Sequence, residues 1–136
     1  MTGRHEREEI AERIWEAANT LRRLPDGDRG RLRMQAMSWP ALLRDASEHG
    51  AYKSVQVKMP APGGAQIDRM HEVLEWLLWL AKVEQKFLKA VWLCCGERRD
   101  VAFVAKTLAV HRDTARAYRD NGLDRIAAHA RERRAA

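Results

Sequence analysis

The residues whose types and spacing favour a specific chemistry are two arginines, Arg112 and Arg116, four positions apart near the C-terminal end. On a helix this spacing places both guanidinium groups on one face. A guanidinium group donates two parallel hydrogen bonds in one plane, which matches the acceptors of a guanine edge or of a phosphate. The pair therefore indicates recognition of a nucleic-acid groove, provided that the chain holds it on an exposed helix.

The apolar residues around this pair recur at the offsets of a helix-turn-helix, in which two short helices pack across a tight turn and the second protrudes. Asp100 is expected to cap the first helix, and Asn121-Gly122 is expected to end the second. The ninth residue of the motif, counted from Val101, is Ala109. The backbone there is expected to take positive φ, which favours glycine, and alanine in that conformation costs about 1 kcal/mol. We therefore predict a helix-turn-helix at about 100–121. Its inward positions are Val101, Val104, Ala105, Leu108, Val110, Ala115 and Tyr118.

The second helix, expected at about 112–120, is predicted to contact duplex DNA. Basic side chains that flank it are expected to bind the phosphate backbone, which positions a protein without reading the base sequence. Asp113 and Asp120 repel phosphate, so we expect them to accept from a cytosine amine or to pair with Arg116 and Arg119. The predicted DNA-contacting residues are His111, Arg112, Asp113, Thr114, Arg116, Arg119, Lys106, Arg98, Arg99 and Arg125.

The rest of the chain has the spacing of scaffold helices, so the predicted fold class is all-α. Apolar residues recur at three- and four-residue steps, and Trp76, Trp79 and Leu80 make one helix apolar on nearly every face. Whether this helix bends near Ala81-Lys82 is left open by the pattern. Helices are expected over 5–24, from Ser38 to about 49, over 66–81 and over 82–95, with Gly96 as the last C-cap.

Proline and glycine divide the chain into two regions. Pro25-Asp26-Gly27 ends the first helix, and 52–64 alternates apolar and polar residues before a Pro-Gly-rich run. We interpret this segment as an extended stretch followed by a loop. The expected organisation is an N-terminal helical region with an extended linker, 1–64, and a C-terminal helical domain, 65–136.

The charge of the chain favours an anionic partner. The formal net charge is +6 and the pI is about 9.8, and basic side chains gain free energy by displacing counterions condensed on nucleic acid. The excess is uneven, because residues 97–136 hold ten Lys and Arg against six Asp and Glu. The arginine pair therefore lies in the most basic part of the chain.

The apolar runs and the cysteines indicate a cytoplasmic protein. The longest strongly apolar run, 76–81, is too short to cross a bilayer, and the charged N-terminus lacks the hydrophobic run of a signal peptide. The only cysteines, Cys94 and Cys95, are adjacent, and neighbours rarely form a disulfide because the ring would strain the intervening peptide bond. We expect a reducing compartment and no membrane partner.

Catalysis is not expected. The sequence contains no Ser-His-Asp, Cys-His or paired-carboxylate arrangement that stands out. A zinc site would need two more ligands beside the cysteines, and the histidines supply no pair at suitable spacing. Trp76, Trp79 and Trp92 lie among leucines, which is typical of core packing rather than of base stacking. We therefore predict no enzyme, no metal and no cofactor.

The run from Phe87 to Ala128 resembles the fourth region of sigma factors. The resemblance is carried by an entering helix that ends in Gly96, by the segment VAKTLAVHRDTAR (104–116) and by a trailing helix with Leu123 and Ile126. It implies binding at promoter DNA and contact with RNA polymerase, as in phage or gene-transfer-agent activators. No segment resembles the sigma region that melts the start site, so a complete sigma factor is not expected.

Over its whole length the chain also resembles an uncharacterised family of small proteins found largely on phages and prophages of alphaproteobacteria. This family supplies no established activity. The resemblance is carried by LRRLP (21–25), SWP (38–40), IDRM (67–70), WLLWL (76–80), Trp92 and RDTA (112–115).

The leading hypothesis is a sequence-specific regulator of transcription whose N-terminal helices serve dimerisation or polymerase contact. One alternative is a phage DNA-packaging accessory factor such as a small terminase subunit, which also uses a helix-turn-helix but assembles into a ring. The other is a protein adaptor whose helix-turn-helix no longer contacts DNA. A monomer or dimer in solution favours regulation, whereas a large oligomer favours packaging.

Overall fold

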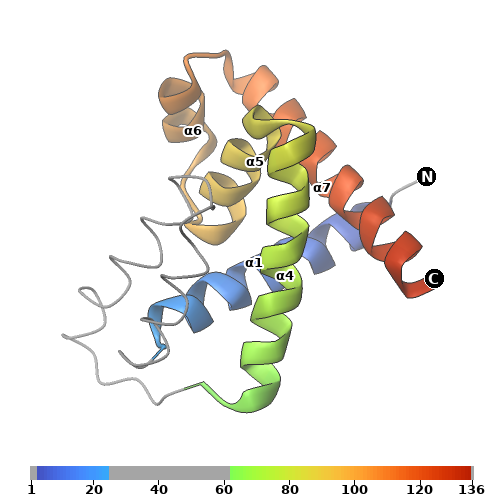
Figure 1. The fold of residues 1–136 in the computed structure, drawn as a ribbon. Coiled ribbons are helices and arrows are strands. Elements are labelled where there is room, and N and C mark those ends of the chain that lie inside the picture. The colour runs from blue at the N-terminus through green and yellow to red at the C-terminus, as the bar shows by residue number, and fades with distance from the viewer. Residues whose placement is uncertain (1–2, 25–61, 136) are drawn as a thin grey trace.

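The computed structural model describes residues 3–24 and 62–135, and within these ranges the chain is all-helical, as predicted. The short helix predicted from Ser38 and most of the extended segment predicted over 52–64 lie outside the described residues. Figure 1 shows α4 crossing α1 while α7 runs diagonally past both. The elements are α1 (Arg4–Arg22), α4 (Gly64–Val83), α5 (Gln85–Val91), the π-helical turn η1 (Trp92–Gly96), α6 (Val101–Leu108) and α7 (Arg112–Ala135).

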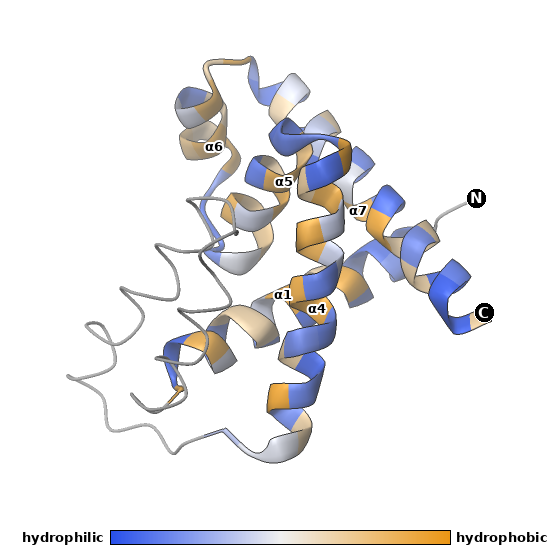
Figure 2. Ribbon diagram, viewed as in Figure 1, coloured by the Kyte–Doolittle hydropathy of each residue, from blue (hydrophilic) through white to orange (hydrophobic). Residues whose placement is uncertain are grey.

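One main core joins α1 to the helices that follow residue 62. The apolar stripe of α1 packs against α4 and α7, and the fully buried side chains of this core include Ile14, Leu77 and Ile126. Figure 2 shows hydrophilic residues on the outer faces of α1 and α7 and hydrophobic residues where the helices meet. Burial of these stripes stabilises the fold, because each fully buried Leu or Ile contributes about 2 kcal/mol.

Ion pairs on the rim of this core hold α1 in place. Arg7 Nε lies 2.7 Å from Asp124 Oδ1 on α7, and Arg69 Nε of α4 lies 2.7 Å from Glu16 Oε1. The hydrogen bond from Arg69 lowers the pKa of the Glu16 carboxyl group. Solvent screens these exposed pairs, so their main effect is to fix the direction of α1.

The structure answers the question that the pattern left open, because the long apolar stretch is interrupted at Glu84. α4 continues to Val83, and Glu84 has extended backbone angles (φ −160°, ψ 108°) before α5 begins at Gln85. The predicted helix over 82–95 is therefore shorter at its start and becomes π-helical at its end. Gly96 is the last residue of η1 and not its C-cap, which is Glu97, and its lack of a Cβ leaves room for the ring of the buried Trp92, which would lie 2.8 Å from such a Cβ.

The prediction that the second helix of the motif ends at Asn121-Gly122 is wrong. α7 does not stop at Asn121-Gly122, and no separate trailing helix follows, because one helix runs from Arg112 to Ala135. Gly122 is buried in the interior of α7, where a Cβ would lie 2.5 Å from Cγ2 of Val91. The lack of a Cβ at Gly122 allows α5 and α7 to approach closely, and this glycine does not mark a helix end.

Two of the predicted core tryptophans are buried and one is not. Trp76 and Trp92 are 2% and 1% exposed, whereas Trp79 is partly exposed and stacks on His129 with ring centroids 4.1 Å apart. The stack links α4 to α7 beside the ion pair of Glu75 with Arg133. The stripe of α4 therefore faces two neighbours, α1 and α7, which explains why the helix is apolar over so much of its surface.

Candidate nucleic-acid interface

The corner between α6 and α7 has the backbone that the residue offsets predict. The Asp100 side chain caps α6 by accepting a 2.8 Å hydrogen bond from the backbone N–H of Phe103. α6 ends at Leu108, and Ala109 takes the left-handed conformation (φ 56°, ψ 45°). The N–H of Val110 then donates to the carbonyl oxygen of Ala105 at 3.0 Å. The helix, turn and helix therefore follow one another as a tight corner, which we call the α6–α7 corner.

A small second core holds this corner together. Val104, Ala105 and Ala115 are buried against Leu93 of η1, and the cluster is separate from the main core. Leu108 and Val110 are partly buried on the edge of the same cluster. The inward positions predicted from spacing thus face inward, except that Tyr118 packs against the main core instead.

Relief of the strain at Ala109 provides a test of the corner. Ala109→Gly is expected to raise the free energy of unfolding by about 1 kcal/mol, because glycine adopts left-handed angles without a Cβ clash. The measurement is urea denaturation followed by circular dichroism. The matched control is Ala102→Gly, at an exposed interior position of α6, which is expected to lose about 1 kcal/mol. A loss of stability in both variants would contradict the left-handed turn.

The first two turns of α7 present the arginine pair to solvent. Arg112 and Arg116 are exposed, and only Ala115 is buried among residues 112–121. Arg116 lies 3.4 Å from Asp113 Oδ1, and the side chain of Asp113 is 78% exposed. The pairing expected for one acidic residue is therefore present, through a weak contact at the surface that a stronger acceptor can replace.

Lys106, Arg99 and His111 are also exposed. Lys106 lies on α6, His111 precedes α7, and the Arg99 guanidinium group stands 4.8 Å from the Phe103 ring centroid. Thr114 is partly buried. His111 and Thr114 adjoin the arginine pair in the chain, whereas Lys106 lies on α6 and Arg99 lies just before it.

Three predicted contact residues lie elsewhere. Arg98 bonds to Glu12 at 2.9 Å and its guanidinium group stacks 4.1 Å from the Trp15 ring of α1. Arg119 is bonded to Asp120 at 3.1 Å on the side of α7 that faces α1. Arg125 stands over the Phe87 ring, about 20 Å along α7 from the start of the helix. The structure does not group these three with the exposed pair.

A notch between α1, η1 and α7 contains the first two of these arginines. It has a volume of about 450 Å³. Its four arginines are each bonded to a carboxylate, which neutralises them. The pairs are Arg4 with Glu8, Arg7 with Asp124, Arg98 with Glu12 and Arg119 with Asp120. The arginines of the notch therefore each have a carboxylate partner, although the pair of Arg4 with Glu8 is largely exposed to solvent.

Cys94 and Cys95 line the same notch, and burial opposes their ionisation. Burial raises the pKa of the Cys95 thiol to about 12, with a further rise from its neighbour Cys94, and burial also raises the pKa of Cys94. Thiolate is the reactive form, so the structure opposes nucleophilic chemistry at this site. Within 3–24 and 62–135, no group of three His, Cys, Asp or Glu side chains is placed to hold a metal ion.

The raised pKa values lead to an expected alkylation pattern. At pH 8 the thiolate fraction of Cys95 is expected to be roughly three orders of magnitude below that of a free thiol, because its pKa is raised above the unfolded value. Iodoacetamide followed by peptide mass mapping should label Cys95 in urea and leave it unmodified in the native protein. Rapid labelling of native Cys95 would show that the thiol is accessible and ionised.

Sequence reasoning assigned no role to Lys86 and Lys89, which also lie near the corner. Both come from α5 and line a hollow whose other walls come from η1, α6 and α7. The available signal was their three-residue spacing among the apolar residues of α5, which places them on one face of a helix. Their proximity to α6 could not be inferred from spacing, because it depends on how α5 packs against α7.

Comparison with known proteins identifies a family whose description names no activity. A family model described as a domain of unknown function (DUF6362) matches residues 22–126, a range that includes α4, α5, α6 and much of α7. No curated protein and no solved structure matches the chain. In the described residues, no helix has the length and apolar character needed to span a membrane.

Proposed function

We propose that this chain, which belongs to the family described as a domain of unknown function (DUF6362), is a non-enzymatic regulator of transcription that binds duplex DNA. The observation that carries the proposal is the exposed pair Arg112 and Arg116 on the first two turns of α7, directly after a left-handed turn. In this proposal the start of α7 enters the major groove, which is about 12 Å wide and admits one helix.

The residues of α6 support the same orientation. In helix-turn-helix proteins the first helix crosses the sugar-phosphate backbone while the second lies in the groove. Lys106 on α6 and Arg99 just before it are both exposed. They would bind phosphate groups on either side of the groove, and Asp113 would either remain paired with Arg116 or accept from a cytosine amine.

The finer parts of the proposal follow from the resemblance to sigma region four. They are a promoter as the target and contact with RNA polymerase. Two other parts of the proposal do not depend on that resemblance: a cytoplasmic location, which follows from the apolar runs and the cysteines, and dimerisation through the N-terminal helices. The competing packaging function predicts a ring. Size-exclusion chromatography with light scattering, with and without duplex DNA, separates the two, because a monomer or dimer supports regulation and a large oligomer supports packaging.

Duplex binding is tested by fluorescence anisotropy with the full chain and a pool of random duplexes, followed by selection and sequencing of the bound fraction. We expect binding to duplex in preference to a single strand of equal length, an enriched motif, and a slope of log affinity against log salt of about −0.9 for each phosphate contact. Absence of duplex binding at about 50 mM salt, where electrostatic binding is strong, would refute the proposal.

A further inference from the structure

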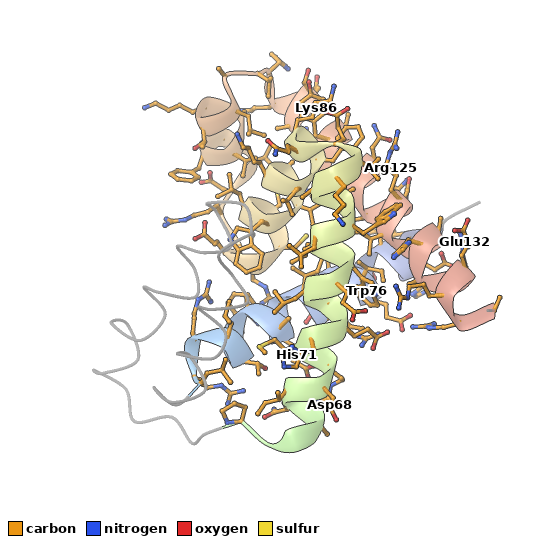
Figure 3. All side chains as sticks on the ribbon, viewed as in Figure 1. Asp68, His71, Trp76, Lys86, Arg125 and Glu132 are labelled. Carbon is orange, nitrogen blue, oxygen red and sulfur yellow. The ribbon has the colours of Figure 1, made fainter. Side chains whose placement is uncertain are left out.

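A hollow of about 460 Å³ lies between α5, η1 and the α6–α7 corner. Its size falls in the range of pockets that hold small organic ligands, about 300–1,000 Å³. Figure 3 labels Lys86 where α5 begins, near the start of α7. The residues that line the hollow are Lys86, Lys89, Leu93, Thr107, Leu108, Val110 and Tyr118.

The chemistry of this lining distinguishes the hollow from the arginine notch. Its walls are mostly apolar, while Lys86 and Lys89 stand at the rim and neither is paired with a carboxylate among the described residues. The ammonium group of Lys86 stands 5.1 Å from the Tyr118 ring centroid and is held there by a cation–π contact. An apolar cavity with two unpaired cations at its edge is complementary to a ligand with an apolar body and one negative charge.

The position of the hollow allows a ligand and DNA to bind together. Tyr118 follows Arg112 by six residues and Arg116 by two, which on a helix separates it from them by about 120° and about 160° around the axis. The hollow is therefore on the other side of α7 from the exposed arginines. A ligand in it would leave the residues proposed to face the groove free.

We propose that this hollow binds a small apolar organic acid, and that the acid acts as an effector of the α6–α7 corner. Its carboxylate pairs with Lys89 and Lys86, and its apolar part packs against Leu108, Val110 and Tyr118. The second half of the proposal depends on the proposed DNA binding, whereas the first half does not.

The coupling has a physical basis in the small core of the corner. α6 is anchored by the cluster of Leu93, Val104, Ala105 and Ala115, which is separate from the main core. A ligand that touches α5 and also Thr107, Leu108 and Val110 joins α6 to the scaffold helix. A ligand stabilises the arrangement that it binds best, so it should favour the orientation of the corner seen here.

Sodium decanoate and the anionic dye 1-anilinonaphthalene-8-sulfonate serve as probes of the full chain. We expect saturable dye fluorescence that decanoate displaces and that decylamine, which has the same chain length and the opposite charge, does not. Displacement by both compounds equally would show nonspecific adsorption to apolar surface and would overturn the proposed acid site.

Matched variants locate the site. Lys89→Gln is expected to weaken decanoate binding about tenfold, because a charge-assisted hydrogen bond is lost. Lys82→Gln removes one charge outside the hollow, so it should change the affinity for decanoate less than about twofold. Val110→Trp should fill the cavity and abolish binding, while Val83→Trp, at an exposed position outside the hollow, should not. Circular dichroism checks that each variant is folded. Equal effects within either pair would overturn the proposed site.

The effector role is measured by duplex anisotropy with and without saturating decanoate. We expect tighter duplex binding in the wild-type protein and no change in Val110→Trp. An unchanged duplex affinity with decanoate bound would refute the effector role and leave the acid site standing. Failure to bind duplex at all would refute the proposed function instead, and the dye displacement would still decide whether the acid site exists.

Discussion

Arg112→Ala combined with Arg116→Ala is expected to weaken duplex binding about 100-fold at physiological salt. Each arginine that forms a bidentate contact with a guanine contributes about 1–3 kcal/mol, so the loss of two contacts of about 1.4 kcal/mol each gives this effect. Both side chains are exposed and lie outside the cores, so the free energy of unfolding should change little. The measurement is an anisotropy titration with the selected duplex at two salt concentrations.

The matched control replaces Arg133 and Arg134, which are exposed at the other end of α7, by alanine. Both double variants lower the net charge by two, so a general electrostatic effect would be equal in them. We expect the control to lose much less affinity. A further variant, Arg112→Lys with Arg116→Lys, keeps the charge and removes the planar fork, and it should lose discrimination between sequences more than total affinity. Equal losses of duplex affinity in the two alanine variants would exclude recognition of bases in the groove by the start of α7.

Gly122→Ala is expected to lower the free energy of unfolding by about 1 kcal/mol, although alanine is the better helix former. Helix propensity alone favours alanine by about 1 kcal/mol. The new Cβ would lie 2.5 Å from Cγ2 of Val91 and 3.3 Å from the carbonyl oxygen of Phe87, and overpacking of this kind costs about 1–3 kcal/mol or more. The backbone oxygen cannot move without displacing α5, so the packing effect should exceed the propensity effect.

Urea denaturation followed by circular dichroism measures this change. Gly64→Ala is the matched control, because Gly64 is also helical and a Cβ there meets nothing within 4 Å. We expect the control to be neutral or slightly more stable. If Gly122→Ala is as stable as the wild-type protein, α5 and α7 are further apart than the structure shows.

Local features of the fold could be predicted because each depends on a few consecutive residues. Apolar residues at three- and four-residue steps were sufficient for α1, because burial of one stripe is what stabilises an amphipathic helix. Asp100 caps α6 and Ala109 takes positive φ as the offsets required. A cap and a turn involve only a short stretch of chain, so residue type and spacing are enough to identify them.

Other features depend on contacts between distant residues, and these could not be predicted. Asn121-Gly122 has the residue types of a helix end, but Gly122 is interior to α7 because α5 packs against it. The helix break falls at Glu84 and not at Ala81-Lys82. The same residue types are compatible with either outcome, and the packing partner decides between them.

The features of the candidate site also divide into those that the local sequence determines and those that depend on tertiary contacts. The sequence by itself determined that Arg112 and Arg116 share a helix face after a tight turn. Tertiary structure decided that Arg98 and Arg119 are bonded to carboxylates in the notch, and that Lys86 and Lys89 border a hollow beside α6. The physical reason is that helix periodicity fixes which residues share a face, while the surroundings of that face depend on helices from other parts of the chain.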